Sequence, residues 1–333
     1  MPHTVAIAGA AGYMGQEALD RVLAHPELEV LALGSDSLAG RPAAALDVRL
    51  NGSISNGHLP PFVPNAEAVA AGANLVLAAL GNREAAELEP PAGAVVVDLS
   101  GAHRLADTSL YAEWYGFEHP RPAAQREWCY ALPELQPPSG RLIANPGCYV
   151  TAVLLALVPL KNSVDPASVV VDAKSGVSGA GRTPREDTIA GAVLENLSPY
   201  KIGTHQHVPE MAQVLGFAPT FVPHLLPVRR GLIATCYVDL HEGNDAHELL
   251  QDAYADAPLV RVLPPGVAPE LARVQSTDEA ELGVFTDRAT GRTIVIAAID
   301  NLGKGGAGQA VQNANVALGL EPTLGLRRTG VLV

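Results

Sequence analysis

Short runs of β-branched and other apolar residues recur along the first half of the chain. They lie at residues 4–9, 29–35, 74–80, 94–100 and 141–145. Continuous apolar runs of this length are typical of strands buried on both faces of a parallel sheet. Between the first two runs, residues 13–26 carry apolar side chains at helical spacing that end before Pro26. This segment predicts a crossover helix, and hence a βαβ unit at the start of the chain.

The second half of the chain has a different pattern. Strand-like runs lie at residues 168–176, 220–228, 231–240, 259–264 and 293–301, with fewer helical segments between them. This arrangement favours a mixed or antiparallel sheet. A final helix is expected at 305–320 and is predicted to return to the first domain. We therefore divide the chain into residues 1–147 with 303–333, and residues 148–302.

Length and charge narrow the classes of function. The chain has 333 residues, which suits two domains, and 22 basic residues against 35 acidic ones give a net charge of −13. Such a charge argues against nucleic acid or an anionic membrane as partner. No apolar run reaches the roughly 20 residues of a membrane span, and no basic leader precedes an apolar stretch, so we expect a cytoplasmic protein.

A glycine-rich turn follows the first predicted strand. The motif GAAGYMG places Gly9, Gly12 and Gly15 where the crossover helix begins. Glycines there permit close backbone approach, so that the helix amides and dipole can bind a pyrophosphate. The same spacing also occurs in purely structural turns. Its place in a βαβ unit favours dinucleotide binding by Gly9, Ala11, Gly12, Tyr13, Met14 and Gly15.

The end of the second strand leaves the choice of dinucleotide open. Asp36 lies where an NAD-binding fold places a ribose-binding carboxylate. Ser35, Ser37 and Arg41 offer hydroxyls and a cation that suit the 2′-phosphate of NADPH. Asp36 is also interpretable as a solvated loop acid. We predict NADPH/NADP+ as the cofactor, with Ser35, Ser37 and Arg41 at the 2′-phosphate.

Cysteine placement points to a nucleophile. Cys129, Cys148 and Cys236 are widely spaced and lack the paired spacing of zinc or redox sites, so we expect three separate thiols and no metal. Cys148 follows Pro-Gly and begins an apolar helical run, where a helix N-terminus lowers a thiol pKa. The other two have apolar neighbours and are expected to pack as small hydrophobes.

Two histidines form the second chemical signal. His205 and His207 stand two residues apart, and Pro209 suits the first turn of a following helix. No carboxylate or cysteine cluster completes a metal set, so a general acid or base is favoured over zinc. The alternative is that one or both histidines only form hydrogen bonds in a loop and have no catalytic role. We favour His205 as the acid or base and His207 as its neighbour, although the sequence does not order them.

Six further segments carry a family resemblance. In order along the chain they are YALPEL (130–135), NPGCYVTA (145–152), SGVSGAGR (175–182), ENLSPYKIGTHQHVPE (195–210), PHLLPVRRGLIAT (223–235) and DNLGKGGAGQAVQN (300–313). With GAAGYMG, the chain resembles the N-acetyl-γ-glutamyl-phosphate reductases of the aspartate-semialdehyde dehydrogenase superfamily over nearly its whole length. It departs from the family at Val150, where proline is commoner, and at Gln206, where Arg or Lys is commoner.

The resemblance implies a fold, a reaction and further site residues. The fold is α/β, with a Rossmann-like parallel-sheet NADP-binding domain and an α+β substrate and dimerisation domain. The reaction is NADPH-dependent reduction of an acyl phosphate to an aldehyde in arginine biosynthesis, catalysed by a homo-oligomer, dimer or tetramer. The substrate residues implied are Arg104, Arg230 and Glu210, and the additional cofactor residues are Ser178, Gly179 and Asn301.

The chemistry expected at Cys148 is a thioester. Its thiolate displaces phosphate, hydride reduces the thioester, and an imidazole supplies a proton, with backbone amides at the Pro-Gly-Cys turn as an oxyanion hole. Three alternatives stay open: a reductase of carrier-protein-linked aminoadipyl phosphate in lysine biosynthesis, an aspartate-semialdehyde dehydrogenase, and a non-catalytic NADPH-sensing protein. An acidic carrier would need a basic docking surface, so we predict a small-molecule acyl phosphate, N-acetyl-L-glutamyl 5-phosphate.

Overall fold

The computed structural model describes residues 1–50, 59–183, 186 and 189–330. The chain divides into two compact units. Unit 1 comprises Met1–Pro146 and Gly306–Leu326, and unit 2 comprises Gly147–Gly305 and Arg327–Val333. The change of unit therefore falls inside the Pro-Gly-Cys turn, and the chain returns to unit 1 at its last helix.

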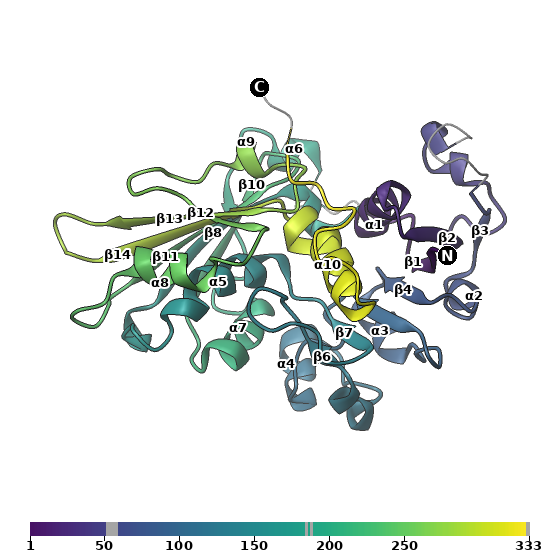
Figure 1. Cartoon of the computed structure of the whole chain (residues 1–333), viewed down its shortest axis with the longest axis horizontal. Helices are drawn as coiled ribbons and strands as arrows, with labels where there is room; N and C mark the ends of the chain where they lie inside the picture. The colour runs from purple at the N-terminus through teal and green to yellow at the C-terminus, as the bar shows by residue number, and fades with distance from the viewer. Residues whose placement is uncertain (51–58, 184–185, 187–188, 331–333) are drawn as a thin grey trace. The chain divides into compact units, whose positions relative to one another are not determined.

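Unit 1 is built on a seven-stranded parallel sheet with the order β3-β2-β1-β4-β5-β7-β6 (Figure 1). The strands are β1 His3–Ala8, β2 Leu28–Gly34, β3 Phe62–Val63, β4 Leu75–Ala78, β5 Val95–Asp98, β6 Cys129–Tyr130 and β7 Leu142–Ala144. The central strands β4 and β5 are buried at every position, as expected of strands covered on both faces. The predicted parallel sheet and its five apolar strands are confirmed.

Helices cover the strands of unit 1. They are α1 Tyr13–Ala24, α2 Asn65–Val69, α3 Asn82–Glu87, α4 Tyr111–Tyr115 and α10 Gly308–Ala317. The last helix, α10, contacts α1 and β5, although it comes almost 300 residues after α1 (Figure 1). Ala307, Ala310, Val311 and Ala314 of this region join the core that contains Val5, Ile7 and Leu19. The helix is shorter than the predicted 305–320, because residues 303–307 form a π-helical turn.

Gly9 fixes the turn between β1 and α1. Its φ is +76°, and a Cβ there would lie 2.2 Å from the main-chain oxygen of Ala79. Gly15, inside α1, comes equally close to the Gly9 oxygen, where a Cβ would lie 2.2 Å away. Only glycine permits this backbone conformation and these approaches. The first turn of α1 can therefore sit directly over the end of the sheet.

Unit 2 contains a mixed seven-stranded sheet with the order β12-β13-β14-β11-β8-β10-β9. Pairs β8/β10 and β12/β13 are parallel, and the other pairs are antiparallel. The strands are β8 Val170–Gly176, β9 Ser198–Pro199, β10 Thr220–Leu226, β11 Leu232–Val238, β12 Val260–Val262, β13 Ala280–Thr286 and β14 Thr293–Ile299. The helices are α5 Cys148–Leu157, α6 Ala190–Val193, α7 His207–Leu215, α8 Ala246–Ala253 and α9 Leu271–Val274.

Helix α5 is the central helix of unit 2. Every residue from Tyr149 to Leu157 is buried, and the helix contacts β11, β14 and α7. A helix that is apolar all round is expected in a core. Along β11, alternate residues point to this covered side, where Ala234 and Cys236 are fully buried. Burial raises the pKa of the Cys236 thiol to about 12, in agreement with the small-hydrophobe interpretation.

The main omission of the sequence prediction is β13. Its sequence AELGVFT contains Glu281 and Gly283, which interrupt the apolar pattern. Glu281 is nevertheless buried, and its carboxylate accepts from Arg273 Nε at 2.9 Å. The strands β3, β6 and β9 have two residues each, too few to show a period.

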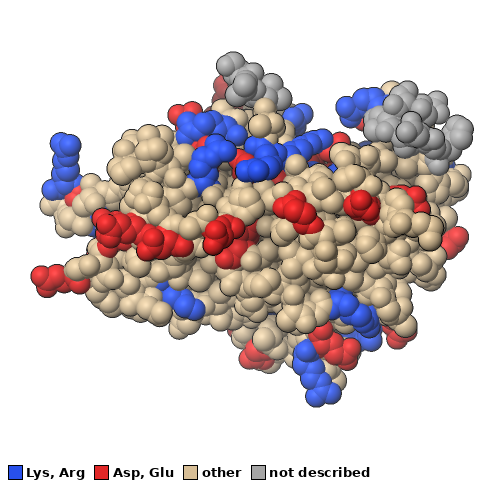
Figure 2. All heavy atoms as spheres, viewed as in Figure 1, with Lys and Arg blue, Asp and Glu red and all other residues tan. Residues whose placement is uncertain are grey.

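Helix length and surface charge bear on whether the chain could meet a membrane or nucleic acid. Among the described residues, no helix is long and apolar enough to cross a membrane. On the face drawn in Figure 2, acidic side chains stand close to basic ones in several places. Three exposed arginines of unit 2 show this pairing, because Arg261, Arg273 and Arg328 all contact glutamates.

Candidate functional site

The predicted dinucleotide loop begins α1 in unit 1. Gly12 is the N-cap of α1 and supplies no side-chain cap, and the first turn carries no acidic residue. Gln16 closes the loop by donating from Nε2 to the Ala11 oxygen at 2.9 Å. Tyr13 is 39% exposed at the first helical position. Amides without a side-chain cap, in a first helical turn without an acidic residue, suit an anionic pyrophosphate, so these residues fit a dinucleotide.

The end of β2 has a defined hydrogen-bond pattern. Ser35 is buried, and its Oγ lies 3.3 Å from Ser37 Oγ. Arg41 is exposed. Asp36 is also exposed, but it accepts two hydrogen bonds from Asn65: from the backbone amide at 2.9 Å and from Nδ2 at 3.1 Å. Asp36 is therefore exposed to solvent, as one of the two interpretations expected, and it is also held in place by Asn65.

Cys148 is the first residue of α5, as predicted. Gly147 is the N-cap in an extended conformation, with no side-chain cap. The turn packs tightly on the residues after β14, because a Cβ at Gly305 would lie 2.9 Å from Cys148 Cβ. Sequence analysis missed this role of Gly305. The adjacent glycines in KGGAG were the available signal, since repeated glycine often marks a close backbone approach.

Glu210 lies beneath the Cys148 turn. Its side chain is fully buried on α7, and Oε1 accepts from the Gly147 amide at 2.9 Å. This bond ties the helix that begins at His207 to the helix that begins at Cys148. The Gly147 amide is thus committed to a carboxylate, which removes it from the expected oxyanion hole. Glu210 fits a positioning role better than the substrate contact predicted from the sequence.

The two histidines lie at the start of α7. His205 precedes the helix, His207 is its first residue, and both are buried. Their rings are 4.6 Å apart between centroids, and Tyr149 packs edge-on against both. The sequence did not predict this aromatic contact. Tyr200 adds a further edge contact to His205 and donates from its hydroxyl to that of Tyr149 at 3.2 Å.

His205 has a fixed tautomer. The backbone amide of His207 donates to His205 Nδ1 at 3.2 Å, so the proton of the neutral ring is on Nε2. Burial, with a smaller contribution from the charge of Lys201, lowers the pKa of His205 to about 3. A ring in this state can donate a hydrogen bond from Nε2 but does not titrate near neutrality. This differs from the acid or base role favoured for His205 on sequence grounds.

The two predicted substrate arginines differ in their surroundings. Arg230 is buried, and it donates from Nε and Nη2 to the carboxylate of Asp300 at 2.5 and 3.1 Å. Its charge is therefore balanced inside unit 2, which weighs against the predicted substrate contact. Arg104, in unit 1, donates to two main-chain oxygens, those of Asn145 at 2.8 Å and Leu99 at 3.0 Å. Asn145 stands three residues before Cys148 in the chain.

The remaining predicted cofactor residues lie together in unit 2. Asn301 is fully buried, accepts from the Gly231 amide at 2.8 Å and donates to Ser178 Oγ at 3.0 Å. Gly179 lies beside them, because a Cβ there would be 3.6 Å from Asn301 Nδ2. Asn301 thus braces the segment after β8 against the segment after β14. This arrangement supports the glycine-rich turn that follows β8.

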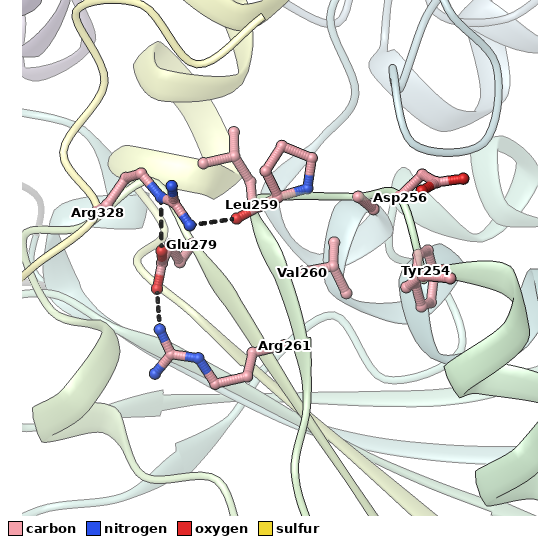
Figure 3. Close-up of a pocket in the computed structure, with 10 residues that line it drawn as sticks. Tyr254, Asp256, Leu259, Val260, Arg261, Glu279 and Arg328 are labelled. Carbon is pink, nitrogen blue, oxygen red and sulfur yellow. Dashed lines mark hydrogen bonds and ion pairs between the residues drawn. The ribbon is translucent and has the colours of Figure 1, made fainter.

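A surface hollow of about 490 Å³ in unit 2 is lined by none of the predicted site residues. Figure 3 shows Glu279 between Arg261 and Arg328, with Arg328 also donating to the Pro258 oxygen. Both guanidinium groups thus pair with Glu279, and Arg261 also lies 3.7 Å from the carboxylate of Glu281. The candidate chemistry lies instead at Cys148, His205 and His207. Among the described residues, no cluster of histidine, cysteine or acidic side chains has the form of a metal site.

The chain matches two family models in tandem. Residues 4–141 match the NAD binding domain of semialdehyde dehydrogenases, and residues 148–301 match the semialdehyde dehydrogenase dimerisation domain. A protein named N-acetyl-gamma-glutamyl-phosphate reductase from Salinispora tropica is 43% identical over 338 residues, covering 98% of each chain. One of the same name from Geobacter metallireducens is 39% identical and covers 97% of each.

Solved structures share the fold. Aspartate semialdehyde dehydrogenase II of Vibrio cholerae, complexed with ASA, has a TM-score of 0.71 at 19% identity, covering 96% of this chain and 98% of that one. The aspartate semialdehyde dehydrogenase of Candida albicans, solved with NADP, has a TM-score of 0.67 at 16% identity, covering 95% and 99%. At these identities the likeness concerns the fold.

The state of His205 predicts a pH dependence of stability. The unfolded ring has a pKa near 6.5 and the folded ring a pKa of about 3, so the unfolded state binds more protons between these values. The stabilisation is complete above pH 6.5 and declines toward pH 3, by about 1.4 kcal/mol per pH unit for one proton. His205→Asn should remove this share of the slope.

The measurement is urea unfolding of wild type and variant between pH 4 and 7.5, roughly the interval over which a histidine titrates. His241→Asn is the matched control, because His241 is exposed. It should keep the wild-type slope. An unchanged slope in His205→Asn would show that His205 is not held neutral in the folded state.

Proposed function

This chain belongs to the N-acetyl-gamma-glutamyl-phosphate reductase family, and we propose that it reduces N-acetyl-L-glutamyl 5-phosphate to the 5-semialdehyde through a thioester on Cys148. The observation that carries the proposal is the position of Cys148 at the N-terminus of the buried helix α5, close to the start of the histidine helix α7. Partial positive charge at a helix N-terminus favours the thiolate, which is the reactive form of cysteine. The reaction belongs to arginine biosynthesis.

We assign the dinucleotide to unit 1 and the acyl substrate to unit 2, dividing the chain near the turn at Gly147. Gly9, Gly12 and the amides that open α1 would hold the pyrophosphate, and Ser35, Ser37 and Arg41 would contact the 2′-phosphate of NADPH. When bound, NADPH supplies the hydride that reduces the acyl group. The protein's own residues hold the acyl group and move the protons.

The first chemical step forms the thioester. Cys148 Sγ attacks the acyl carbon, the bond from that carbon to the phosphate-bearing oxygen breaks, and phosphate leaves with the electron pair. Arg104 is the cation we assign to this leaving group, since it is anchored to the carbonyl of Asn145, close in the chain to Cys148. Arg230 is not assigned here, because Asp300 already balances its charge.

The second step releases the aldehyde. After hydride addition, the carbonyl oxygen of the thioester carries negative charge, and the bond to Cys148 Sγ then breaks to regenerate the thiolate. Over the whole reaction one proton is consumed and leaves on phosphate. We assign to His207 the transfer of this proton to the phosphate that leaves in the first step, and to Nε2–H of His205 the hydrogen bonding of the developing oxyanion. The tautomer and low pKa of His205 support this order of roles.

The substrate is proposed to be a free small molecule. Relatives named for N-acetyl-gamma-glutamyl-phosphate reduction match over 97% or more of the chain, from the first strand to the last helix. The chain has 35 acidic residues and only 22 basic ones, and this negative charge would also oppose docking of an acidic carrier protein. Both observations favour the acetylated glutamyl phosphate over carrier-linked aminoadipyl phosphate.

A second copy of the chain is proposed to cover the open face of the unit 2 sheet. On that face, Ile294, Tyr237 and Val170 lie in one cross-strand row, and all three are only half-buried. In the next row Ile296 and Val222 are also half-buried, with Thr235 and Asp172 between them. Apolar sheet faces of this kind are buried in stable assemblies. The dimerisation-domain match covers all of these residues.

Cys148→Ser tests the nucleophile. A serine hydroxyl is almost wholly protonated near neutrality, so reduction should fall by at least about 10³-fold while NADPH binding stays at the wild-type level. The measurement pairs a coupled assay with N-acetylglutamyl phosphate and a fluorescence titration with NADPH. Cys129→Ser, at a cysteine outside α5, should keep wild-type turnover. Turnover of Cys148→Ser close to that of wild type would contradict the thioester.

Tyr237→Arg tests the oligomer. A charge in the middle of the apolar row should oppose burial against a second copy. In analytical ultracentrifugation, wild type should sediment as a dimer or larger, and the variant should shift toward the 34.6 kDa monomer. Leu31→Arg is the control, because Leu31 lies in unit 1 and is 39% exposed. This variant should sediment like the wild type. A monomeric wild type, or an unshifted variant, would reject this interface.

A further inference from the structure

The amide of Asn65 occupies the corner of unit 1 where two strand ends and two carboxylates meet. Asn65 is the first residue of α2, and its Oδ1 accepts from the Gly9 amide at 2.9 Å. Its Nδ2 donates to Asp36 Oδ2 at 3.1 Å and to Glu84 Oε1 at 3.0 Å. One acceptor and both donor hydrogens are used, so the orientation of the amide is determined by its partners.

Asp36 is held at both carboxylate oxygens. The Asn65 backbone amide donates to Oδ1 at 2.9 Å, while the Asn65 side chain takes Oδ2. Asp36 stands two residues after β2, where dinucleotide folds that prefer NADH present a carboxylate to the ribose hydroxyls. To accept from a ribose hydroxyl, at least one oxygen of such a carboxylate must be turned toward the ribose. Asn65 holds them toward the start of α2.

The same side chain supports the phosphate-binding turn. Gly9 has a φ of +76°, and its amide is fixed by Asn65 Oδ1. Gly34, the last residue of β2, leaves the room for this amide, because a Cβ there would lie 2.9 Å from Asn65 Oδ1. Gly9 and Asp36 are therefore connected through one residue. Asn65 thus links the position of the glycine turn to that of the residues after β2.

We propose that Asn65 is a positioning residue that sets the preference for NADPH over NADH, by holding the Asp36 carboxylate away from the ribose hydroxyls. The proposal rests on the assignment of the dinucleotide to unit 1. With Asp36 restrained, Ser35, Ser37 and Arg41 are left to recognise the 2′-phosphate. Release of Asp36 would let its carboxylate accept from the hydroxyls of NADH and repel the 2′-phosphate of NADPH.

The test measures dissociation constants of NADPH and NADH for the full-length protein by nucleotide fluorescence, without turnover. In Asn65→Ala, the ratio of the NADH to the NADPH dissociation constant should fall by about tenfold or more, the effect expected of gaining a charged hydrogen bond. Adding Asp36→Ala in the same chain should restore the wild-type ratio, because the shift acts through the released carboxylate.

Asn74→Ala is the matched control. Asn74 also braces strands of unit 1, since its Oδ1 accepts from the amide and hydroxyl of Thr4 at 3.0 and 3.1 Å, but Thr4 lies near the opposite end of β1 from Gly9. This variant should leave the ratio unchanged. Equal weakening of both dinucleotides in Asn65→Ala would mean that Asn65 only supports the turn, and would overturn the proposal.

A second variant leaves Asn65 in place. If the carboxylate is restrained in the wild type, Asp36→Ala alone should change NADH binding by less than about threefold. A tenfold loss of NADH binding would show that Asp36 already contacts the ribose, and would overturn the proposal. A wild-type protein that binds neither dinucleotide would instead refute the proposed function itself.

Discussion

The hydrogen bond from the Gly147 amide to Glu210 Oε1 is the contact on which the placement of the cysteine helix against the histidine helix depends. It satisfies one of the amides that a helix leaves unpaired at its N-terminus, and it does so with a side chain from another helix. Because Glu210 lies one turn after His207, the bond sets the position of the histidines relative to Cys148. A fully buried carboxylate is costly unless it is hydrogen-bonded, so this contact also resists rearrangement.

A second buried carboxylate fixes the other side of the cysteine turn. Asp300 is fully buried and accepts from Arg230 and from the backbone amides of Leu302 and Gly303 at 2.9 and 3.0 Å. These bonds shape the turn that carries Gly305 against Cys148. Arg230, which the family resemblance indicated as a substrate contact, is paired with this carboxylate. The pair lies beside the backbone against which Cys148 packs.

Sequence analysis predicted the features that follow from local physical chemistry. The parallel strands of unit 1 show as apolar runs, and Cys148 at a helix start follows from Pro-Gly before an apolar segment. It could not predict partners distant in the chain. Glu210, Arg230 and Asp36 were each expected to face a ligand or solvent, and each is held by a residue or backbone amide from another element. The strand β13 was missed because its buried Glu281 breaks the apolar pattern.

For the histidine pair, too, the local sequence indicated the chemistry but not the contacts with distant residues. Residue type and spacing indicated acid–base chemistry, but which ring titrates depends on burial and on a backbone amide that only the folded chain supplies. The ring at His205 is surrounded by Tyr149, Tyr200 and Phe221, and none of these contacts is visible in the local sequence. The folded structure is therefore needed to decide which histidine transfers the proton.

Glu210 couples the cysteine helix to the histidine helix. The most direct test of this coupling is the rate at which phosphate is released in a single turnover, when excess enzyme meets N-acetylglutamyl phosphate without reduced dinucleotide, compared between Glu210→Gln and Glu210→Leu. The amide oxygen of glutamine can still accept from Gly147, so that variant should form the thioester within about fivefold of the wild-type rate. Leucine has no acceptor, and its rate should fall by about 10² or more although circular dichroism shows a folded protein. Phosphate release by Glu210→Leu at the wild-type rate would show that Glu210 does not couple the two helices.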